Sequence, residues 1–490
     1  MATEPAATPA HAASLTKAMG GVQLFALGFG GIVGAGWVVA LGGWLNEAGP
    51  LGAIVAFALG GIAISLVGLC YAEMTMALPR SGGEVVYAYE LFGLRTCFAM
   101  GWCLTLAYIA TTVFEALSVA WLVDALLPWT LGPTLYTVAG EPVRAGTLAL
   151  GLGGTVVITY INYRGVRPAS AAQDVFTYLK IAIAAVFVVA GLVWGSADNL
   201  EPLFAGSGRG GAAQWGGIAA VMTTAPFWFG GFNTIAQVME EKAPRTSLRV
   251  AGRMIVLSIV AAAVFYCLVI LSASMVVPWR RLVTAELPVA GAFETAFGSP
   301  VLAKLVLVAA LLGILTVWNG VAIAASRVLY ALGRASIISP AFGRVHPRYG
   351  SPATAVVVSG IISGVGVLLG RAAIGPVVNV ASTCFALGYL LVCAGLLRLR
   401  RTRPDLDRPY RVPGGAVTIP AAALTAAGMV VLSLHGPLAG AARGIPLEWW
   451  VLVAWVVLGA AFWVVTRALR GRVSEAERRA LIAGAGAAPR

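Results

Sequence analysis

Two ionisable residues, Glu115 and Lys180, lie inside long apolar segments of the chain. Such residues are costly in a membrane and are functional candidates by default. A buried amine such as that of Lys180 can gain and lose a proton near neutral pH, unless its stem extends to the interface instead. Glu115 could bind an amine, relay a proton or accept a hydrogen bond as a neutral acid, and a purely structural pairing is the alternative.

Two glycine-rich interruptions offer a second kind of chemistry, which uses the backbone. Segment 28–36 reads GFGGIVGAG and segment 226–233 reads PFWFGGFN, and both lie within apolar stretches. An unwound backbone is tolerated in a membrane only where protein or a water-filled cavity satisfies its polar groups. Paired breaks at equivalent positions of two halves point to a transporter with its site at the breaks. Close helix packing by small residues is the alternative.

Enzymatic chemistry has little support in the sequence. The three histidines, His11, His346 and His435, lack partners at metal-ligand spacing. No GxxxxGK[ST] phosphate loop occurs, and Val33 stands where a GxGxxG fingerprint needs its third glycine. We therefore expect no enzyme, no cofactor, no metal and no ATP-driven transport by this chain.

The elements that hold these residues must be membrane helices. Of the 490 residues, 59% are hydrophobic and 11% are charged, whereas soluble domains contain about 25% charged residues. The mean hydropathy is +0.88. Disordered chains are polar and rich in charge, so disorder is excluded as well. The six cysteines lie mostly in apolar stretches, which does not indicate a disulfide framework.

Twelve spans of about 20 apolar residues account for most of the chain. We predict them at 22–45, 51–77, 95–127, 145–161, 169–195, 215–239, 250–277, 300–333, 353–370, 373–397, 416–435 and 447–469. With a cytoplasmic N-terminus, most of the 33 Lys and Arg residues fall on the cytoplasmic side, as the positive-inside rule requires. The net charge of +13 therefore reflects membrane orientation, and no nucleic-acid partner is expected.

Five motifs, in order, resemble those of the amino acid–polyamine–organocation (APC) transporters. The opening motif is GGIVGAG at 30–36, and the others fall at 71–89, 231–245, 326–352 and 399–413. The resemblance extends over nearly the whole chain.

The resemblance implies an all-α polytopic membrane protein with a five-plus-five inverted repeat (LeuT-type), broken helices 1 and 6, and two added helices. The chain then divides into a cytoplasmic tail (1–20), a first repeat (21–195), a second repeat (215–397), a basic cytoplasmic loop (398–415), two further helices (416–469) and a C-terminal cytoplasmic tail (470–490).

The resemblance also implies how the breaks bind an amino acid. The amides of Ala35 and Gly36, at the start of a half-helix, would hold the carboxylate. The carbonyls of Ile32, Phe227 and Gly230 would hold the ammonium group.

Other residues of the second break are candidates for the pocket or a gate. Gly231 and Asn233 are expected at the substrate, and a neutral Asn233 disfavours cationic side chains. Four aromatic residues, Phe227, Trp228, Phe229 and Phe232, flank this break; one or two of them are expected to be functional, with Phe227 as the first choice for an aromatic cap. Trp318 is a weaker candidate.

Lys180 matches a position of the family where a lysine is thought to replace a sodium site. This implies proton coupling, with Gly31 and Ser326 as expected neighbours. At the cytoplasmic mouth, we expect Glu73, Glu84, Glu240 and Glu241 to form solvent-exposed pairs with arginines such as Arg80, each worth about 0–1 kcal/mol.

The sequence thus leads to one function and one alternative. The first is a secondary active transporter that moves an amino acid across the plasma (bacterial inner) membrane by alternating access, with both termini cytoplasmic. A proton gradient or a counter-substrate would drive it, and no obligatory protein partner is evident. The alternative is an amine or polyamine carrier of the same fold, which Glu115 would favour.

Overall fold

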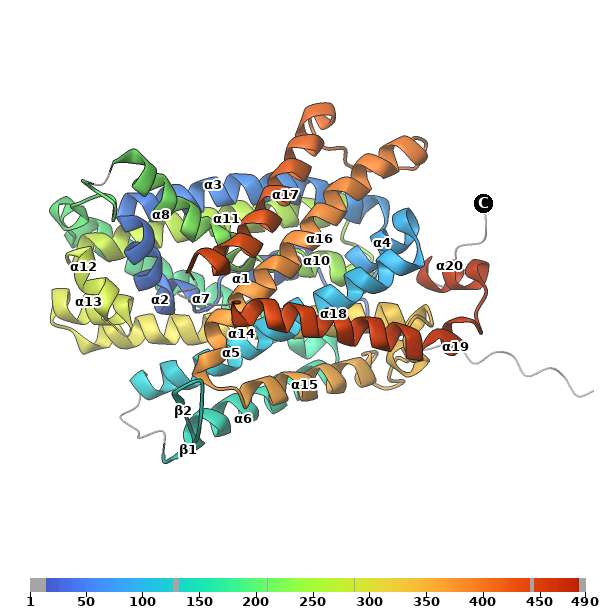
Figure 1. Ribbon diagram of the computed structural model, residues 1–490, viewed down its shortest axis with the longest axis horizontal. Helices are drawn as coiled ribbons and strands as arrows, with labels where there is room; N and C mark the ends of the chain where they lie inside the picture. The colour runs from blue at the N-terminus through green and yellow to red at the C-terminus, as the bar shows by residue number, and fades with distance from the viewer. Residues whose placement is uncertain (1–14, 127–131, 209, 286, 441–444, 484–490) are drawn as a thin grey trace, which may run out of the picture.

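The computed structural model describes residues 15–126, 132–208, 210–285, 287–440 and 445–483. Long helices dominate this part of the chain and run roughly along one direction (Figure 1). The α-helices are α1 (Gly21–Ile32), α2 (Gly36–Val39), α3 (Leu41–Ala77), α4 (Glu84–Phe92), α5 (Leu94–Leu126), α6 (Ala145–Tyr163), α7 (Val166–Trp194), α8 (Gly211–Thr223), α9 (Ala225–Trp228), α10 (Thr234–Gln237), α11 (Leu248–Val276), α12 (Trp279–Thr284), α13 (Pro288–Phe297), α14 (Pro300–Arg334), α15 (Ala353–Val367), α16 (Ile374–Thr402), α17 (Gly415–Gly440), α18 (Leu447–Val465), α19 (Arg467–Arg470) and α20 (Glu475–Ala483).

Short 3₁₀ helices and one hairpin complete the secondary structure of the described residues. The 3₁₀ helices are η1 (Ala197–Leu200), η2 (Met239–Glu241), η3 (Pro340–Gly343) and η4 (Arg371–Ala373). Strands β1 (Thr134–Val138) and β2 (Glu141–Arg144) pair antiparallel between α5 and α6. This hairpin was not predicted from the sequence, which indicated helices alone. Its two strands are short and lie outside the apolar segments.

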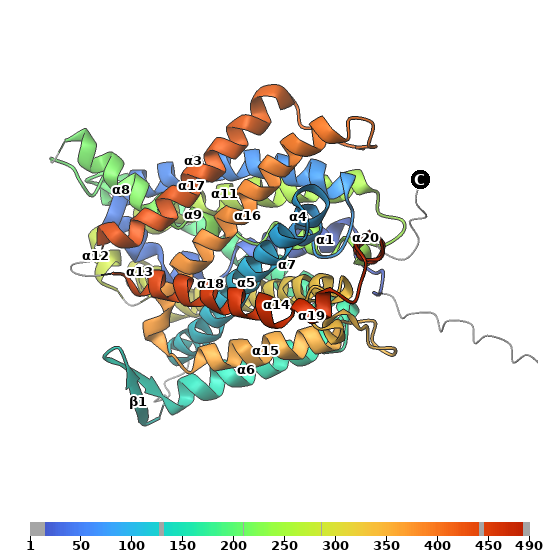
Figure 2. The ribbon, with the colours of Figure 1, turned by 45° about the vertical axis from the view of Figure 1, so that its right-hand side comes forward.

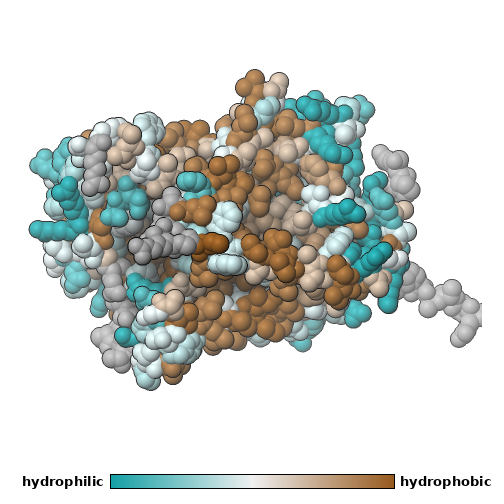
Figure 3. Space-filling model, in the orientation of Figure 1, coloured by the Kyte–Doolittle hydropathy of each residue, from teal (hydrophilic) through white to brown (hydrophobic). Residues whose placement is uncertain are grey.

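The helices form a membrane-spanning bundle. Within the described residues, ten helical segments are long and apolar enough to cross a bilayer, and α15 is a shorter apolar helix. An apolar belt surrounds the middle of the visible face, with polar residues at its two ends (Figure 3). We call the end that holds α4 and α20 the basic end; it is on the right in Figure 1. Arg478 belongs to α20, and Arg334 donates a hydrogen bond to the Ile482 carbonyl of the same helix.

The first predicted span is broken in the middle. Helix α1 ends at Ile32, Val33 is extended with φ −89° and ψ 91°, and α2 begins at Gly36. The second half of this span continues into α3, and Gly49, with φ +73°, separates it from the next span. The predicted boundary near residue 50 is therefore present as a kink at which two helical segments of α3 meet.

The sixth predicted span is broken as well. Helices α8, α9 and α10 are separated by residues 224 and 229–233. Gly231 has φ +139°, and a Cβ at this position would collide with the backbone of Gly31. Only glycine allows the two breaks to touch, and this contact brings the unwound segments together in the bundle.

The breaks are enclosed by packed helices. Helices α3, α5, α11 and α14 provide most of the buried core around them. Helices α6 and α15 lie side by side along one flank (Figure 2). Helix α18 is mostly exposed and contacts α5 through hydrogen bonds between Trp102 and Trp455.

Candidate functional site

A small pocket lies where the two breaks meet. Its walls come from both breaks and from α5, α11 and α14. The lining residues are Gly31, Ile32, Gly34, Gly36, Thr111, Phe114, Glu115, Phe227, Trp228, Gly230, Tyr266 and Val317. The pocket therefore combines unwound backbone, aromatic side chains and one carboxyl group.

Tyr266 connects the two breaks. Its hydroxyl lies 3.2 Å from the carbonyl oxygens of both Ile32 and Trp228, where it can donate its proton to one or the other. Tyr266 is not among the site residues predicted from the sequence. A Tyr among the apolar residues of α11 could have indicated it, because a buried Tyr hydroxyl normally has a hydrogen-bond partner.

Aromatic side chains shape the rest of the pocket. The Trp228 ring packs over Gly36, where a Cβ would lie 2.7 Å from its Cε3 atom. Phe227 meets Phe114 edge to face with ring centroids 5.2 Å apart. The backbone amide of Gly36, in the first turn of α2, has no acceptor within the helix. The site thus presents an amide donor beside an aromatic wall.

The other predicted residues of the second break lie outside the pocket lining. Phe229 packs on Tyr266, with centroids 5.9 Å apart, and Phe232 packs on Tyr71 at 5.1 Å. Gly231 forms the contact between the breaks, and its amide donates to Asn233 Oδ1 at 3.2 Å.

Asn233 points away from the pocket toward the basic end. Its Nδ2 atom donates to Tyr108 Oη at 2.8 Å and to Glu84 Oε1 at 3.1 Å. Ala35 is fully buried and does not belong to the pocket lining. Trp318 lines a separate cavity between α5, α6, α14 and α15.

Glu115 lines the pocket itself. Its carboxyl lies against the unwound backbone, since a Cβ on Gly34 would be 2.8 Å from Oε1. Oε2 is buried and has no hydrogen-bond partner among the described residues. The carboxyl group is close enough to the Lys180 amine for electrostatic interaction.

Lys180 lies behind the first break and is fully buried. Its Nζ atom donates to the Val33 carbonyl at 2.5 Å and to Thr316 Oγ1 at 2.9 Å. The alternative that its stem extends to the interface is therefore wrong. The expectation of Ser326 as a neighbour is also wrong, because Ser326 lies further along α14 and accepts a hydrogen bond from Arg327 Nη1.

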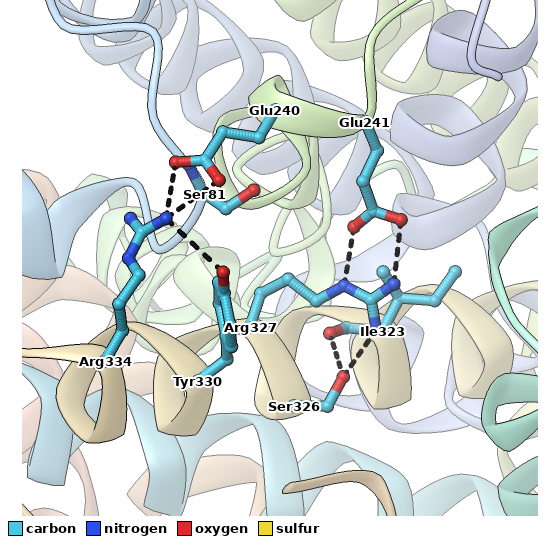
Figure 4. Close-up of polar contacts among 8 residues, drawn as sticks. All are labelled: Ser81, Glu240, Glu241, Ile323, Ser326, Arg327, Tyr330 and Arg334. Carbon is cyan, nitrogen blue, oxygen red and sulfur yellow. Dashed lines mark hydrogen bonds and ion pairs between the residues drawn. The ribbon is translucent and has the colours of Figure 1, made fainter. Parts of the chain in front are cut away.

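The acids near the basic end differ from expectation. Figure 4 shows Glu241 paired with Arg327 through two bonds of 2.6 and 2.8 Å, and Glu240 paired with Arg334 at 2.9 Å. Neither acid pairs with Arg80, and the Glu241–Arg327 pair is buried. The polar sequence around these residues suggested solvent, but α10 and η2 fold against α14.

Glu73 and Glu84 are also buried, which corrects the expectation of solvent-exposed pairs. Glu73 binds Arg400 through Oε1 at 2.9 Å and Oε2 at 2.5 Å. Glu84 accepts hydrogen bonds from neutral side chains, as described below.

Comparisons of the sequence with known proteins identify one family and several relatives. A family model described as "Amino acid permease" matches residues 19–462. A branched-chain amino acid permease of Bacillus subtilis is 27% identical over 86% of this chain and 89% of its own length. A methylthioribose transporter of the same organism is 25% identical over 91% of this chain and 92% of its own. The human b(0,+)-type amino acid transporter 1 is 26% identical over 82% of this chain and 79% of its own.

Proposed function

Since this chain belongs to the amino acid permease family, we propose that it is a secondary transporter that moves a zwitterionic amino acid by alternating access, coupled to a proton. The supporting observation is the pocket at the contact of the two breaks. Membership of this family implies a membrane-embedded transporter with a small-molecule substrate. It implies no enzymatic role.

The proposed architecture has twelve crossings. The broken segment α8–α10 and the short helix α15 would add two crossings to the ten long ones. The breaks in the first and sixth crossings would then occupy equivalent positions of a five-plus-five inverted repeat. In this proposal the basic end faces the cytoplasm, since Lys and Arg concentrate there, and both termini are cytoplasmic.

The substrate's charged groups would bind to the broken backbone. The Gly36 amide, at the positive end of a half-helix, suits a carboxylate, and the Ala35 amide would support it. The carbonyls of Ile32, Phe227 and Gly230 suit an ammonium group. Tyr266 would give up its bond to Ile32 when the ammonium arrives, because both compete for the same oxygen.

The pocket walls favour a neutral side chain. Phe114, Phe227 and Val317 are apolar, and Thr111 provides one hydroxyl near them. An aliphatic or small polar side chain would fill this space without leaving a buried charge unpaired.

Lys180 supports proton coupling through its contact with the first break. As an ammonium group it donates to Val33 and Thr316, and so it ties α7, the break and α14 together. A neutral amine makes weaker hydrogen bonds than a charged one. Loss of the proton would therefore loosen the break, which is the movement that alternating access requires.

An amine or polyamine carrier is the second candidate, and Glu115 favours it. The carboxyl lines the pocket, and its Oε2 has no hydrogen-bond partner in the described part of the chain. A carboxylate there would bind a substrate's cationic amine. Glu115→Gln should then abolish amine uptake, whereas uptake of a neutral amino acid should change by less than about fivefold, because one buried hydrogen bond contributes about 1 kcal/mol.

A transport screen tests both candidates. Purified protein in liposomes would be offered the twenty amino acids together with ethanolamine, agmatine, putrescine and spermidine, with and without an inward proton gradient. Mass spectrometry would identify what accumulates. Accumulation of neutral amino acids that requires the gradient is the expected result. Accumulation of amines alone would contradict the carboxylate-binding role of Gly36, and exchange without dependence on the gradient would contradict proton coupling.

A further inference from the structure

Glu84 is a buried acid on the path between the pocket and the basic end. It is the first residue of α4, outside the ten membrane-spanning segments, and its side chain is fully buried. Its cluster includes Tyr108 on α5, which lies one turn nearer the basic end than the pocket residue Thr111. The cluster therefore lies between the pocket and the basic end.

Neutral donors from three elements surround the Glu84 carboxyl. Tyr71 on α3 donates to Oε1 at 2.9 Å, and Asn233, just before α10, donates to the same atom at 3.1 Å. Gln237 on α10 donates to Oε2 through a very short contact. These bonds connect α10, which follows the second break, to α4 and α3.

The described residues provide no cationic partner for this carboxyl. The other titratable groups that face it are the phenols of Tyr71 on α3, Tyr87 on α4, Tyr108 on α5 and Tyr389 on α16. Four arginines of the neighbouring elements are paired with other acids: Arg327 with Glu241, Arg334 with Glu240, Arg400 with Glu73, and Arg403 with Glu90.

One acceptor of the cluster has no partner. Gln237 Oε1 is buried and receives no hydrogen bond from the described residues, although Nε2 of the same amide binds Glu84. Rotation of this amide would turn Oε1 toward Glu84 Oε2. A proton on Oε2 would then be donated to Gln237 Oε1, so the cluster can bind both forms of the acid.

We propose that the Glu84 carboxyl is a proton-binding site of an inner gate, protonated while α10 covers it and deprotonated when α10 moves away and admits water. The proposal rests on the proposed transport function, in which the basic end opens to the cytoplasm. The proton on Glu84 is distinct from any proton on Lys180, because the two side chains share no hydrogen-bond partner.

The direction of the pH effect follows from burial. Burial raises the pKa of Glu84 from 4.5 to about 7 in the closed arrangement. Exposure to water on opening returns the pKa toward its ordinary value. Because the closed form binds the proton more tightly, acid on this side stabilises the closed gate. The ratio of closed to open forms should rise by about tenfold between pH 8 and pH 6.

Two measurements on the purified full-length protein in nanodiscs test the proposal without a substrate. Infrared difference spectra taken during a pH titration should show a protonated-carboxyl band with a midpoint near pH 7. The band should be absent in Glu84→Gln. Amide hydrogen exchange of residues 231–241, corrected for its intrinsic pH dependence, should slow by about tenfold from pH 8 to pH 6 in the wild type and stay constant in Glu84→Gln.

Controls separate this role from a merely structural one. Glu90→Gln removes an acid of the same helix that is paired with Arg403, and it should leave both readouts unchanged. Gln237→Met keeps Glu84 but removes a hydrogen-bond donor to its charged form. The midpoint of the carboxyl band should therefore move to higher pH. This variant tests the proposal if Glu84→Gln fails to fold. A band that survives in Glu84→Gln, or exchange of 231–241 that does not change with pH in the wild type, would overturn the proposal. Because no transport is measured, a failed transport screen would not affect this test.

Discussion

At the scale of single residues, the most consequential side chains are those that touch the broken backbone. Lys180 donates to the unwound carbonyl of Val33, and Tyr266 bridges the carbonyls of Ile32 and Trp228. A free carbonyl inside a membrane is costly unless it has a donor. These two side chains therefore set the conformation of the breaks, and a change in either donor alters the break directly.

Replacing Lys180 tests its link to the proton gradient. Lys180→Met keeps a long side chain but removes the donor to Val33 and the titrating group. We expect accumulation driven by the gradient to fall at least tenfold, while exchange of substrate across the membrane continues, because binding uses other atoms. The measurement is uptake into liposomes with and without the gradient. Lys304→Met, which removes an exposed lysine of α14, is the control. Undiminished accumulation in Lys180→Met would contradict the coupling role.

The sequence predicted some of these residues and not their partners. An ionisable side chain inside an apolar segment can be recognised from the sequence alone. Lys180 and Glu115 could therefore be identified as candidates. For Glu84 the sequence predicted a solvent-exposed pair, because the residue follows a polar loop and a glycine pair. Its burial comes from the packing of α4 against α5 and α16 and from the Gln237 side chain of α10. Pairings such as Arg327 with Glu241 join distant segments and leave no local signal.

At the scale of elements, the glycine breaks determine the site. Gly231 has φ +139° and approaches the backbone of Gly31, so the two unwound segments meet at one point. The glycine and proline content of segments 28–36 and 226–233 predicted both interruptions correctly, since these residues disfavour helix interiors. The same pattern could not predict which aromatic residues face the pocket, because one residue along a helix changes direction by about 100°.

Gly36 offers a test of this close packing. Gly36→Ala would place a Cβ against the Trp228 ring, which a hydrogen bond to Thr224 at 2.9 Å and contact with Trp44 hold in position. We expect the ring to move into the pocket and substrate affinity to fall at least tenfold, or about 1.4 kcal/mol. The KM for the substrate found in the transport screen is the measurement. Gly43→Ala, where a Cβ meets nothing within 4 Å, should leave KM unchanged; equal losses in both variants would contradict the role of Gly36.

At the scale of the whole molecule, ion pairs close the basic end. The Glu241–Arg327 pair joins the segment after the second break to α14, and Glu240–Arg334 lies beside it (Figure 4). Helix α20 adds a further connection, since Arg334 donates to the Ile482 carbonyl and Arg478 donates to the Ala335 carbonyl. The C-terminal segment therefore packs on the same end that Glu84 closes from within.

The two ion pairs should differ in their effect on stability. Arg327→Ala leaves the Glu241 carboxylate buried without its partner, and the loss should be about 3–5 kcal/mol. Arg334→Ala affects a partly exposed pair and should cost about 1 kcal/mol. Thermal unfolding of the purified variants would measure the difference as a larger fall in melting temperature for Arg327→Ala. The double variant Arg327→Met/Glu241→Leu should regain most of the lost stability, because apolar side chains of similar volume replace a buried pair without an unpaired charge. A double variant as unstable as Arg327→Ala would show instead that the pair's geometry, and not the orphaned charge, holds this end of the molecule closed.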